Sequence, residues 1–222
     1  GLREVFDSNG KIYQRIMFKN DVQNGLSEHF ENGKIVQKSI FKNGVSNGIT
    51  IIYRQDGTIS DKAEMLDGRY HGTYEWYDLD GKLTEKATMA DGRFHGIYEW
   101  YSHSDGSLSQ RAIYKDGKKS GLQEFFRPDG SLIERGMIVN DKFSGLYEWF
   151  HPDGSLDQRA IYKDGLKNGL QEWFRPDGSL KKRAMMIDDV NNGLYEWFDH
   201  PDGSLDQRAI YKDGLKNGLR EF

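Results

Sequence analysis

Short runs of alternating side-chain character recur along the whole chain, and each is too short to form a helix. In the run GLYEWF from Gly145, an extended backbone places Tyr147 and Trp149 on one face and Phe150 on the other. The run SLDQRAIY follows after HPDG and is again rich in residues that favour strands. The pattern therefore predicts strands over 145–150 and 155–162.

The same phrase recurs every 23 to 25 residues, and this internal repeat determines the architecture. Nine units and a terminal stub ending at Phe222 begin at Gly1, Gly25, Gly48, Gly72, Gly96, Gly121, Gly145, Gly169, Gly193 and Gly218. The first three units lack Trp and are richer in Asn and Lys. We interpret residues 1–71 as diverged, capping-like hairpins and residues 72–222 as regular hairpins, both in one continuous repeat domain.

Tight turns join the predicted strands. HPDG places Pro and Gly where a type I turn with a left-handed glycine needs them, and KDGLKNG at 163–169 is expected to form the closing turn. Short strands joined by such turns pair antiparallel with their sequence neighbours. The expected fold is all-β: an elongated, single-layer antiparallel meander of about nine β-hairpins with strands of about six to eight residues, twisted or curved by strand twist.

The segment GTYEWYDLDGKLTEKATMADGRFHG from Gly72 resembles a MORN repeat, with its initial Gly, its aromatic strand, its Asp-Gly turn and its closing His-Gly. It is similar to the bacterial variant found in the YwqK-like antitoxin family. The resemblance is strong from Gly72 onward and weaker before it, where Ile51 and Ile52 replace Glu and an aromatic residue. It implies stacked antiparallel hairpins and a repeat without catalytic residues of its own.

Aromatic residues occupy fixed positions of the unit and form the candidate protein-binding face. The third and fifth positions hold Tyr74, Trp76, Tyr98, Trp100, Phe125, Tyr147, Trp149, Trp173, Tyr195 and Trp197, with Gln123 and Gln171 in alternate units. Two interpretations stay open: the rings pack on one another, or they line an exposed recognition surface. A single layer cannot cover both of its faces, so some aromatic side chains are expected to remain accessible.

Two charged columns accompany the aromatic ones. The fourth position is acidic from Glu4 and Glu28 to Glu196 and Glu221, and a basic column holds Arg15, Lys38, Lys62, Lys86, Arg111, Arg135, Arg159, Arg183 and Arg208. We expect a ladder of cross-strand ion pairs. A two-residue loop at Asp153-Gly154 would oppose Glu148 and Arg159, whereas a bulged type I turn would place Arg159 across from Tyr147. Pro152 favours the bulged turn, so we expect the five arginines to stack on the Tyr/Trp face as possible charged contacts.

Composition and charge narrow the function. The 31 basic and 35 acidic residues are spread evenly and give a net charge of -4, which does not favour nucleic-acid binding. The absence of Cys removes disulfides, thiolate metal sites and a cysteine nucleophile. The six histidines share no column suited to a metal site, and His71 and His95 are assigned to turn chemistry alongside Asn47 and Asn168. No metal, cofactor or catalytic residue is expected.

Identical groups in rows favour binding over catalysis, which needs unlike groups converging in a pocket. The leading hypothesis is a non-catalytic protein-binding scaffold, an antitoxin or immunity-type protein that occludes a toxin. The alternative is a structural or membrane-associated scaffold that self-assembles through its edge strands. Membrane binding is not expected from the charge, and the cytoplasm is the expected location, with a removed leader left open because the sequence starts at Gly1.

Overall fold

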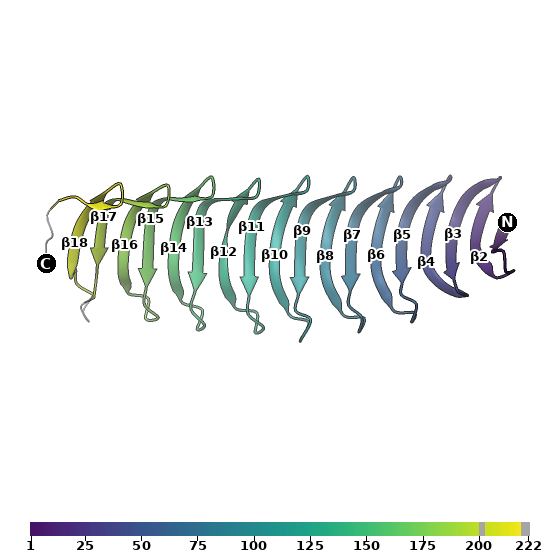
Figure 1. The fold of residues 1–222 in the computed structure, drawn as a ribbon, viewed down its shortest axis with the longest axis horizontal. Coiled ribbons are helices and arrows are strands. Elements are labelled where there is room, and N and C mark those ends of the chain that lie inside the picture. The colour runs from purple at the N-terminus through teal and green to yellow at the C-terminus, as the bar shows by residue number, and fades with distance from the viewer. Residues whose placement is uncertain (200–202, 219–222) are drawn as a thin grey trace. The chain divides into compact units, whose positions relative to one another are not determined.

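The computed structural model describes residues 1–199 and 203–218 and contains one open antiparallel sheet of 19 strands in a meander, with no helix among these residues. The chain divides into two compact units, Gly1–Ser107 with Tyr114–Gly117, and Leu108–Ile113 with Lys118–Phe222. Within each unit, consecutive strands lie side by side, with short turns along one edge and longer loops along the other (Figure 1). The predicted all-β meander of hairpins is confirmed.

The first unit contains nine complete strands. They are β1 (Leu2–Phe6), β2 (Ile12–Lys19), β3 (Val22–Glu31), β4 (Lys34–Lys42), β5 (Val45–Tyr53), β6 (Ile59–Leu66), β7 (Arg69–Tyr77), β8 (Leu83–Ala90) and β9 (Arg93–Tyr101). The residues of β10 (Leu108–Lys115) are shared between the two units.

The second unit continues the same alternation. Its strands are β11 (Lys118–Phe126), β12 (Leu132–Val139), β13 (Lys142–Phe150), β14 (Leu156–Lys163), β15 (Leu166–Phe174), β16 (Leu180–Ile187), β17 (Val190–Trp197), β18 (Gln207–Lys212) and β19 (Leu215–Lys216). The end of the acidic column at Glu221 lies outside the described residues.

The short turn of each hairpin has two residues. Lys163 pairs with Leu166, and the intervening Asp164 and Gly165 both have positive φ, 53° and 92°. These angles define a type I′ turn, whose twist matches that of the flanking strands. The expected longer turn through Asn168-Gly169 is therefore wrong. Gly169, with φ 126°, instead lies inside β15, where the register with β14 shifts, so this strand reaches nine residues rather than six to eight.

The longer loop contains the predicted bulged turn and a second bulge that the sequence analysis missed. The backbone N–H of His151 donates to the carbonyl of Ser155 (N···O 2.8 Å), and that of Gly154 donates to the carbonyl of His151 (2.9 Å). Phe150 then pairs with Leu156, but Trp149 pairs with Gln158, so Asp157 is left out of the pairing. The second bulge cancels the register change made by the first.

Arg159 consequently pairs with Glu148 and not with Tyr147. The same register recurs where Arg135 and Arg183 pair with Glu124 and Glu172. The expectation that the arginines stack on the Tyr/Trp face is wrong, because it allowed for one bulge where the hairpin has two. The arginines lie on the opposite face, which we call the ladder face; the face of the third and fifth positions is the aromatic face.

Most of the buried side chains lie on the aromatic face. A column of Ala63, Ala87, Ala112, Ala160, Ala184 and Ala209 is almost inaccessible, and Tyr98 and Tyr147 are also buried. Tyr147 pairs with Gly136 on one side and Ala160 on the other, and a Cβ added to Gly136 would lie 2.0 Å from the ring. Small residues therefore make room for rings that lie flat on the sheet. The single-layer sheet therefore forms its core from side chains of the aromatic face, without a second layer of structure.

Candidate binding surfaces

Between β7 and β9 of the first unit, the aromatic face is a continuous stack of rings. The centroids of Tyr74 and Trp76 are 4.0 Å apart, those of Trp76 and Tyr98 are 5.9 Å apart, and those of Tyr98 and Trp100 are 4.0 Å apart. Phe94 meets Tyr98 edge-on at 4.8 Å. Of the two interpretations left open, packing of the rings on one another describes these residues, and their ring faces are largely occupied by other rings.

Tyrosine hydroxyls on this face are held by carboxylates of the neighbouring strand. Tyr74 donates to Asp61 (O···O 3.2 Å), and Tyr98 donates to Glu85. Burial raises the pKa of both phenols, and the adjacent carboxylates raise it further. Both hydroxyls therefore remain protonated and act as donors within the sheet.

In the second unit, the stack is interrupted. Tyr147 and Trp149 lie 4.6 Å apart and Tyr195 and Trp197 lie 4.1 Å apart, but between them Gln171 replaces Tyr and is fully buried. Trp173 is covered instead by the ammonium of Lys182, 4.3 Å from the ring centroid. Neighbouring hairpin repeats of the second unit therefore differ in what covers the tryptophan: a tyrosine ring in one and a lysine ammonium in the next.

The ladder face carries the charged columns as alternating ion pairs. Arg135 Nε lies 2.7 Å from Glu148 Oε2, and Arg159 and Arg183 donate likewise to Glu172 and Glu196. In the first unit, Lys62 and Lys86 each lie 3.5 Å from Glu75. The predicted cross-strand ladder is confirmed.

The carboxylates of the ladder are less exposed than their basic partners, and Glu172 and Glu196 are buried. Glu196 is 1% exposed, and hydrogen bonds from Arg183 and Arg208 outweigh the effect of burial and hold its pKa below the usual range. Sixth-position aromatic rings complete the layer, with Arg135 5.5 Å from the centroid of Phe150 and Arg159 5.5 Å from that of Phe174. The expected cation–π contacts exist, but with phenylalanines of the ladder face.

Exposed aliphatic side chains form a further row on the ladder face, which the sequence analysis missed. Leu146 pairs with Ile161, Leu122 with Met137, and Leu170 with Met185. Exposed members of this row are Leu26, Ile40, Ile49, Ile97, Ile113, Met137, Leu146, Ile161, Met185 and Ile210. The signal was in the sequence, since an apolar residue follows most of the marker glycines and another follows the alanine column.

A family model described as a MORN repeat variant matches residues 1–20, 70–91 and 143–164. These segments lie in both units; 70–91 and 143–164 share the glycine, aromatic strand and Asp-Gly turn described above, whereas 1–20 has Asn9-Gly10 at the turn. The chain contains MORN-type repeats. The match concerns the repeat itself, and the narrower resemblance to the YwqK-like antitoxin family stays a prediction.

No curated protein matches the MORN-type chain. Among solved structures, TarM of Staphylococcus aureus, as a mutant in complex with fondaparinux, α-GlcNAc-glycerol and UDP, aligns with 16% identity and a TM-score of 0.32 over 44% of this chain and 19% of that chain. A second TarM structure aligns with 19% identity and a TM-score of 0.30 over 40% of this chain. The repeat chain spans 18% of the length of this second relative.

The sequence-predicted contact residues of the MORN-type units lie together on the aromatic face. Tyr98 and Tyr147 are buried, whereas Tyr74, Trp76, Trp100, Phe125, Trp149, Trp173, Tyr195 and Trp197 are partly exposed. The five arginines lie on the ladder face, so the two candidate groups are separated by the thickness of the sheet. A partner on one face would contact only one group.

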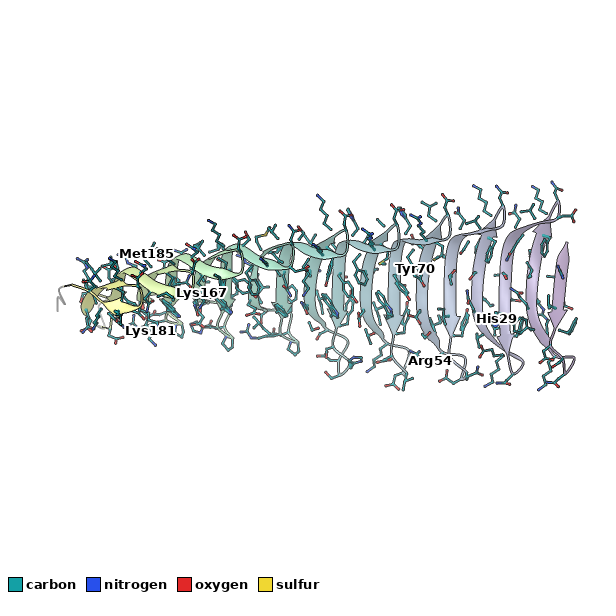
Figure 2. All side chains as sticks on the ribbon, turned by 45° about the horizontal axis from the view of Figure 1, so that its top comes forward. His29, Arg54, Tyr70, Lys167, Lys181 and Met185 are labelled. Carbon is teal, nitrogen blue, oxygen red and sulfur yellow. The ribbon has the colours of Figure 1, made fainter. Side chains whose placement is uncertain are left out.

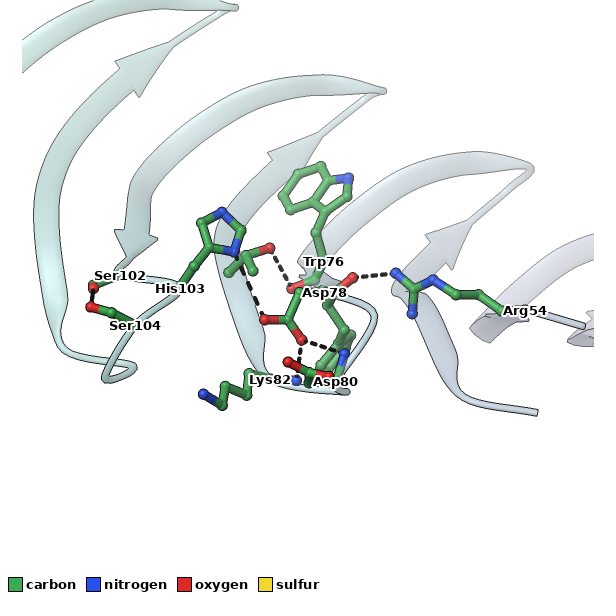
Figure 3. A network of polar contacts seen from close by, with 10 residues as sticks. Arg54, Trp76, Asp78, Asp80, Lys82, Ser102, His103 and Ser104 are labelled. Atoms are coloured by element: carbon green, nitrogen blue, oxygen red, sulfur yellow. Dashed lines mark hydrogen bonds and ion pairs between the residues drawn. The ribbon is translucent and has the colours of Figure 1, made fainter. Parts of the chain in front are cut away.

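Arginines at the loop edge link successive hairpins, and the sequence pattern did not indicate these links. Arg54 donates to the carbonyls of Ile59 (N···O 2.6 Å) and Tyr77, and Figure 3 shows it beside the next loop. There, Asp78 accepts from the backbone N–H groups of Asp80 (3.0 Å) and Lys82 (2.8 Å). Arg127 and Arg175 make equivalent contacts. These contacts fix each loop to its neighbour.

At the other edge, the His or Asn before a marker glycine is also a link between hairpins. His95 Nδ1 lies 3.3 Å from Asp116 Oδ1, and Asn168 Nδ2 donates to Asp188 Oδ1 at 2.9 Å. The assignment of His71 and His95 to turn positions is wrong, because both lie within strands that extend beyond the two-residue turn. Figure 2 draws the side chains of the described residues as sticks on the ribbon.

Within residues 1–199 and 203–218, no group of three His, Asp or Glu side chains is placed to hold a metal ion. The same residues include no helix of the length and apolar character required to cross a membrane.

Proposed function

We propose that this MORN-type repeat chain is a non-catalytic scaffold that binds another protein. The supporting observation is the row of exposed aliphatic side chains on the ladder face. Leu146 is 42% exposed and Met137 is 43% exposed, although both lie in regular strands. Rows of accessible apolar groups among charged ones are typical of protein contact surfaces.

The repetition itself favours binding over catalysis. Most repeats place an acidic, a basic, an aromatic and an aliphatic residue at the same points, so like groups form rows and unlike reactive groups do not converge. Catalytic sites bring unlike groups together around one reacting atom, such as a base beside a nucleophile or beside a group that stabilises developing charge. Binding surfaces, in contrast, gain from repetition, because each unit adds a similar contact.

We propose the aromatic face as a secondary contact surface. Tyr98 and Tyr147 are buried, and the faces of Trp76 and Trp100 are stacked on tyrosines, so a partner would meet mainly ring edges there. Phe125 fills the tryptophan position in one unit. Val5, His29 and Ile52 hold the same position in the first three repeats, so an indole is not required there.

The narrower proposal is an antitoxin or immunity role, in which the scaffold occludes a toxin. It rests on the resemblance of the repeat to that family. Expression of the captured partner alone should then arrest growth, and co-expression of the repeat chain should restore it. A partner that is harmless alone would reject this role and leave the scaffold proposal intact.

The scaffold proposal is tested by affinity capture from extracts of the source cells, with the tagged chain cross-linked and analysed by mass spectrometry. The expected result is one partner in stoichiometric amount that is lost from a Leu146→Ser, Ile161→Thr variant whose circular dichroism is unchanged. Recovery of the chain alone would contradict partner binding and favour self-assembly through edge strands. Trp149→Phe with Trp173→Phe is the matched control for the other face.

A further inference from the structure

The second unit exposes its cations and buries its anions. The side chains of Arg135, Arg159 and Arg183 are 41% to 44% exposed, whereas those of their partners Glu148, Glu172 and Glu196 are 16%, 10% and 1% exposed. The row is neutral in sum but presents guanidinium groups to an approaching molecule. Its outer layer is therefore complementary to carboxylates.

Each of these arginines retains hydrogen-bonding capacity. Its Nε donates to the glutamate of the next strand. Within the described part of the chain, the two Nη groups of Arg135, Arg159 and Arg183 donate no hydrogen bond to a protein acceptor. A guanidinium has five N–H donors in a planar fork, so the Nη groups can take a further carboxylate in fixed geometry.

Apolar contacts lie directly beside this row. Ile161 is the next residue after Arg159 on the same face of β14, and it pairs with Leu146 of β13. A hollow of about 230 Å³ is lined by Leu146, Arg159, Ile161, Leu170 and Glu172. An aliphatic row thus runs beside the arginine row, about 7 Å away along the strands.

The spacing of the rows selects a class of partner. Successive arginines are two strands apart, which is about 9.6 Å for strands spaced about 4.8 Å. Seven residues of an α-helix rise about 10.5 Å, close to this interval. An extended chain presents residues on one side every 6.8 Å or so and does not match it. A helix lying across the strands could therefore contact one arginine of each hairpin repeat in every heptad.

We propose that the ladder face of the second unit binds an acidic amphipathic helix of a partner protein, with Glu or Asp once per heptad on the arginines and Leu-type residues one turn away on the aliphatic row. This inference rests on the protein-binding function proposed above. A second copy of the chain is disfavoured as occupant because it would bring two arginine rows together. An anionic membrane is the competing occupant, and vesicles distinguish it from the helix in the test below.

The test uses the intact chain and a synthetic helical peptide of about four heptads with Glu and Leu in this pattern, titrated by fluorescence anisotropy. A composition-matched peptide with its Glu residues moved to the opposite side of the helix is the control. We expect saturable binding of the first peptide, at least tenfold weaker binding of the second, and a marked salt dependence. Equal binding of the two peptides would overturn the proposal, as would no binding of either.

Matched variants locate the site. Arg135→Lys, Arg159→Lys and Arg183→Lys together retain the charge that pairs with each glutamate, and Lys62 and Lys86 already serve this position in the first unit. This variant should bind the peptide at least tenfold more weakly, whereas Arg69→Lys with Arg93→Lys, at exposed positions of the first unit, should bind it unchanged. The proposal fails if the lysine variant binds normally, or if anionic vesicles bind the chain and compete the peptide away.

Two failures remain distinguishable. If the peptide does not bind but affinity capture still recovers a stoichiometric protein, the acidic-helix inference is wrong and the scaffold function stands. If capture recovers no protein and the peptide does not bind, the proposed function is wrong as well.

Discussion

The two faces of the sheet use their apolar side chains in different ways. On the aromatic face, Tyr98 is buried among Trp76, Phe94 and Trp100, whereas its sequence neighbour Ile97 on the ladder face is 49% exposed. A single layer has no second sheet or helix to cover it, so large rings must cover the small residues of their own face. Aliphatic side chains are too short to do this, and they remain accessible. The difference indicates that the aromatic face stabilises the fold and the ladder face is available for contacts.

The largest expected effect comes from removing a ring on the aromatic face. Tyr98→Ala should lower the free energy of unfolding by about 3 kcal/mol, because it leaves a cavity within the ring stack. Ile97→Ser should change it by less than about 1 kcal/mol, because the side chain is half exposed. Urea denaturation followed by tryptophan fluorescence measures both. Equal losses in the two variants would contradict the division between the faces.

A smaller effect is expected from the buried carboxylate of the ladder. Glu196→Gln should cost about 1 to 2 kcal/mol, because two arginines lose a buried partner. Glu4, which is 38% exposed and pairs with Arg15, provides the comparison, and Glu4→Gln should cost at most about 0.5 kcal/mol. Thermal unfolding in matched buffers gives the ranking. The reverse ranking would show that burial of the glutamate does not determine how much an ion pair of the ladder stabilises the fold.

The raised pKa values of the buried tyrosines on the aromatic face predict that the fold loses stability in alkali. Burial, followed by the nearby carboxylates, raises the pKa of Tyr74, Tyr98 and Tyr147 in the folded chain. Their contribution is fully present below the unfolded pKa of about 10 and is lost as the pH rises above it towards the folded values. Chemical denaturation between about pH 8 and 11 should show this decline, and Tyr98→Phe should reduce its slope. A flat profile would be incompatible with buried phenols.

The smallest expected effect is that of Arg159→Lys on stability, at most about 0.5 kcal/mol. In the first unit, Lys62 and Lys86 already pair with Glu75 from its two neighbouring strands, so the ion pair should form with either lysine or arginine. Differential scanning calorimetry of the wild type and the variant provides the measurement. A loss above about 1.5 kcal/mol would mean that the stack of Arg159 on Phe174 is a major structural contact.

Periodicity predicts the repeat, the strands, both turns with Asp-Gly and the face shared by Tyr147 and Trp149. The side of the sheet taken by Arg159 could not be predicted, because one residue of register reverses a side chain and the bulge at Asp157 has no glycine to mark it. The aliphatic row was missed for another reason. Leu146 and Ile161 look like core residues in any alternating pattern, and only the absence of a second layer leaves them exposed.

The most direct test of the division between the faces is hydroxyl-radical footprinting of the chain with and without its captured partner. Met137 and Met185 report on the ladder face, and Trp149 and Trp173 report on the aromatic face of the same unit. We expect strong protection of the two methionines on binding and little change at the two tryptophans. Protection confined to the tryptophans would contradict the account and assign the contact to the aromatic face.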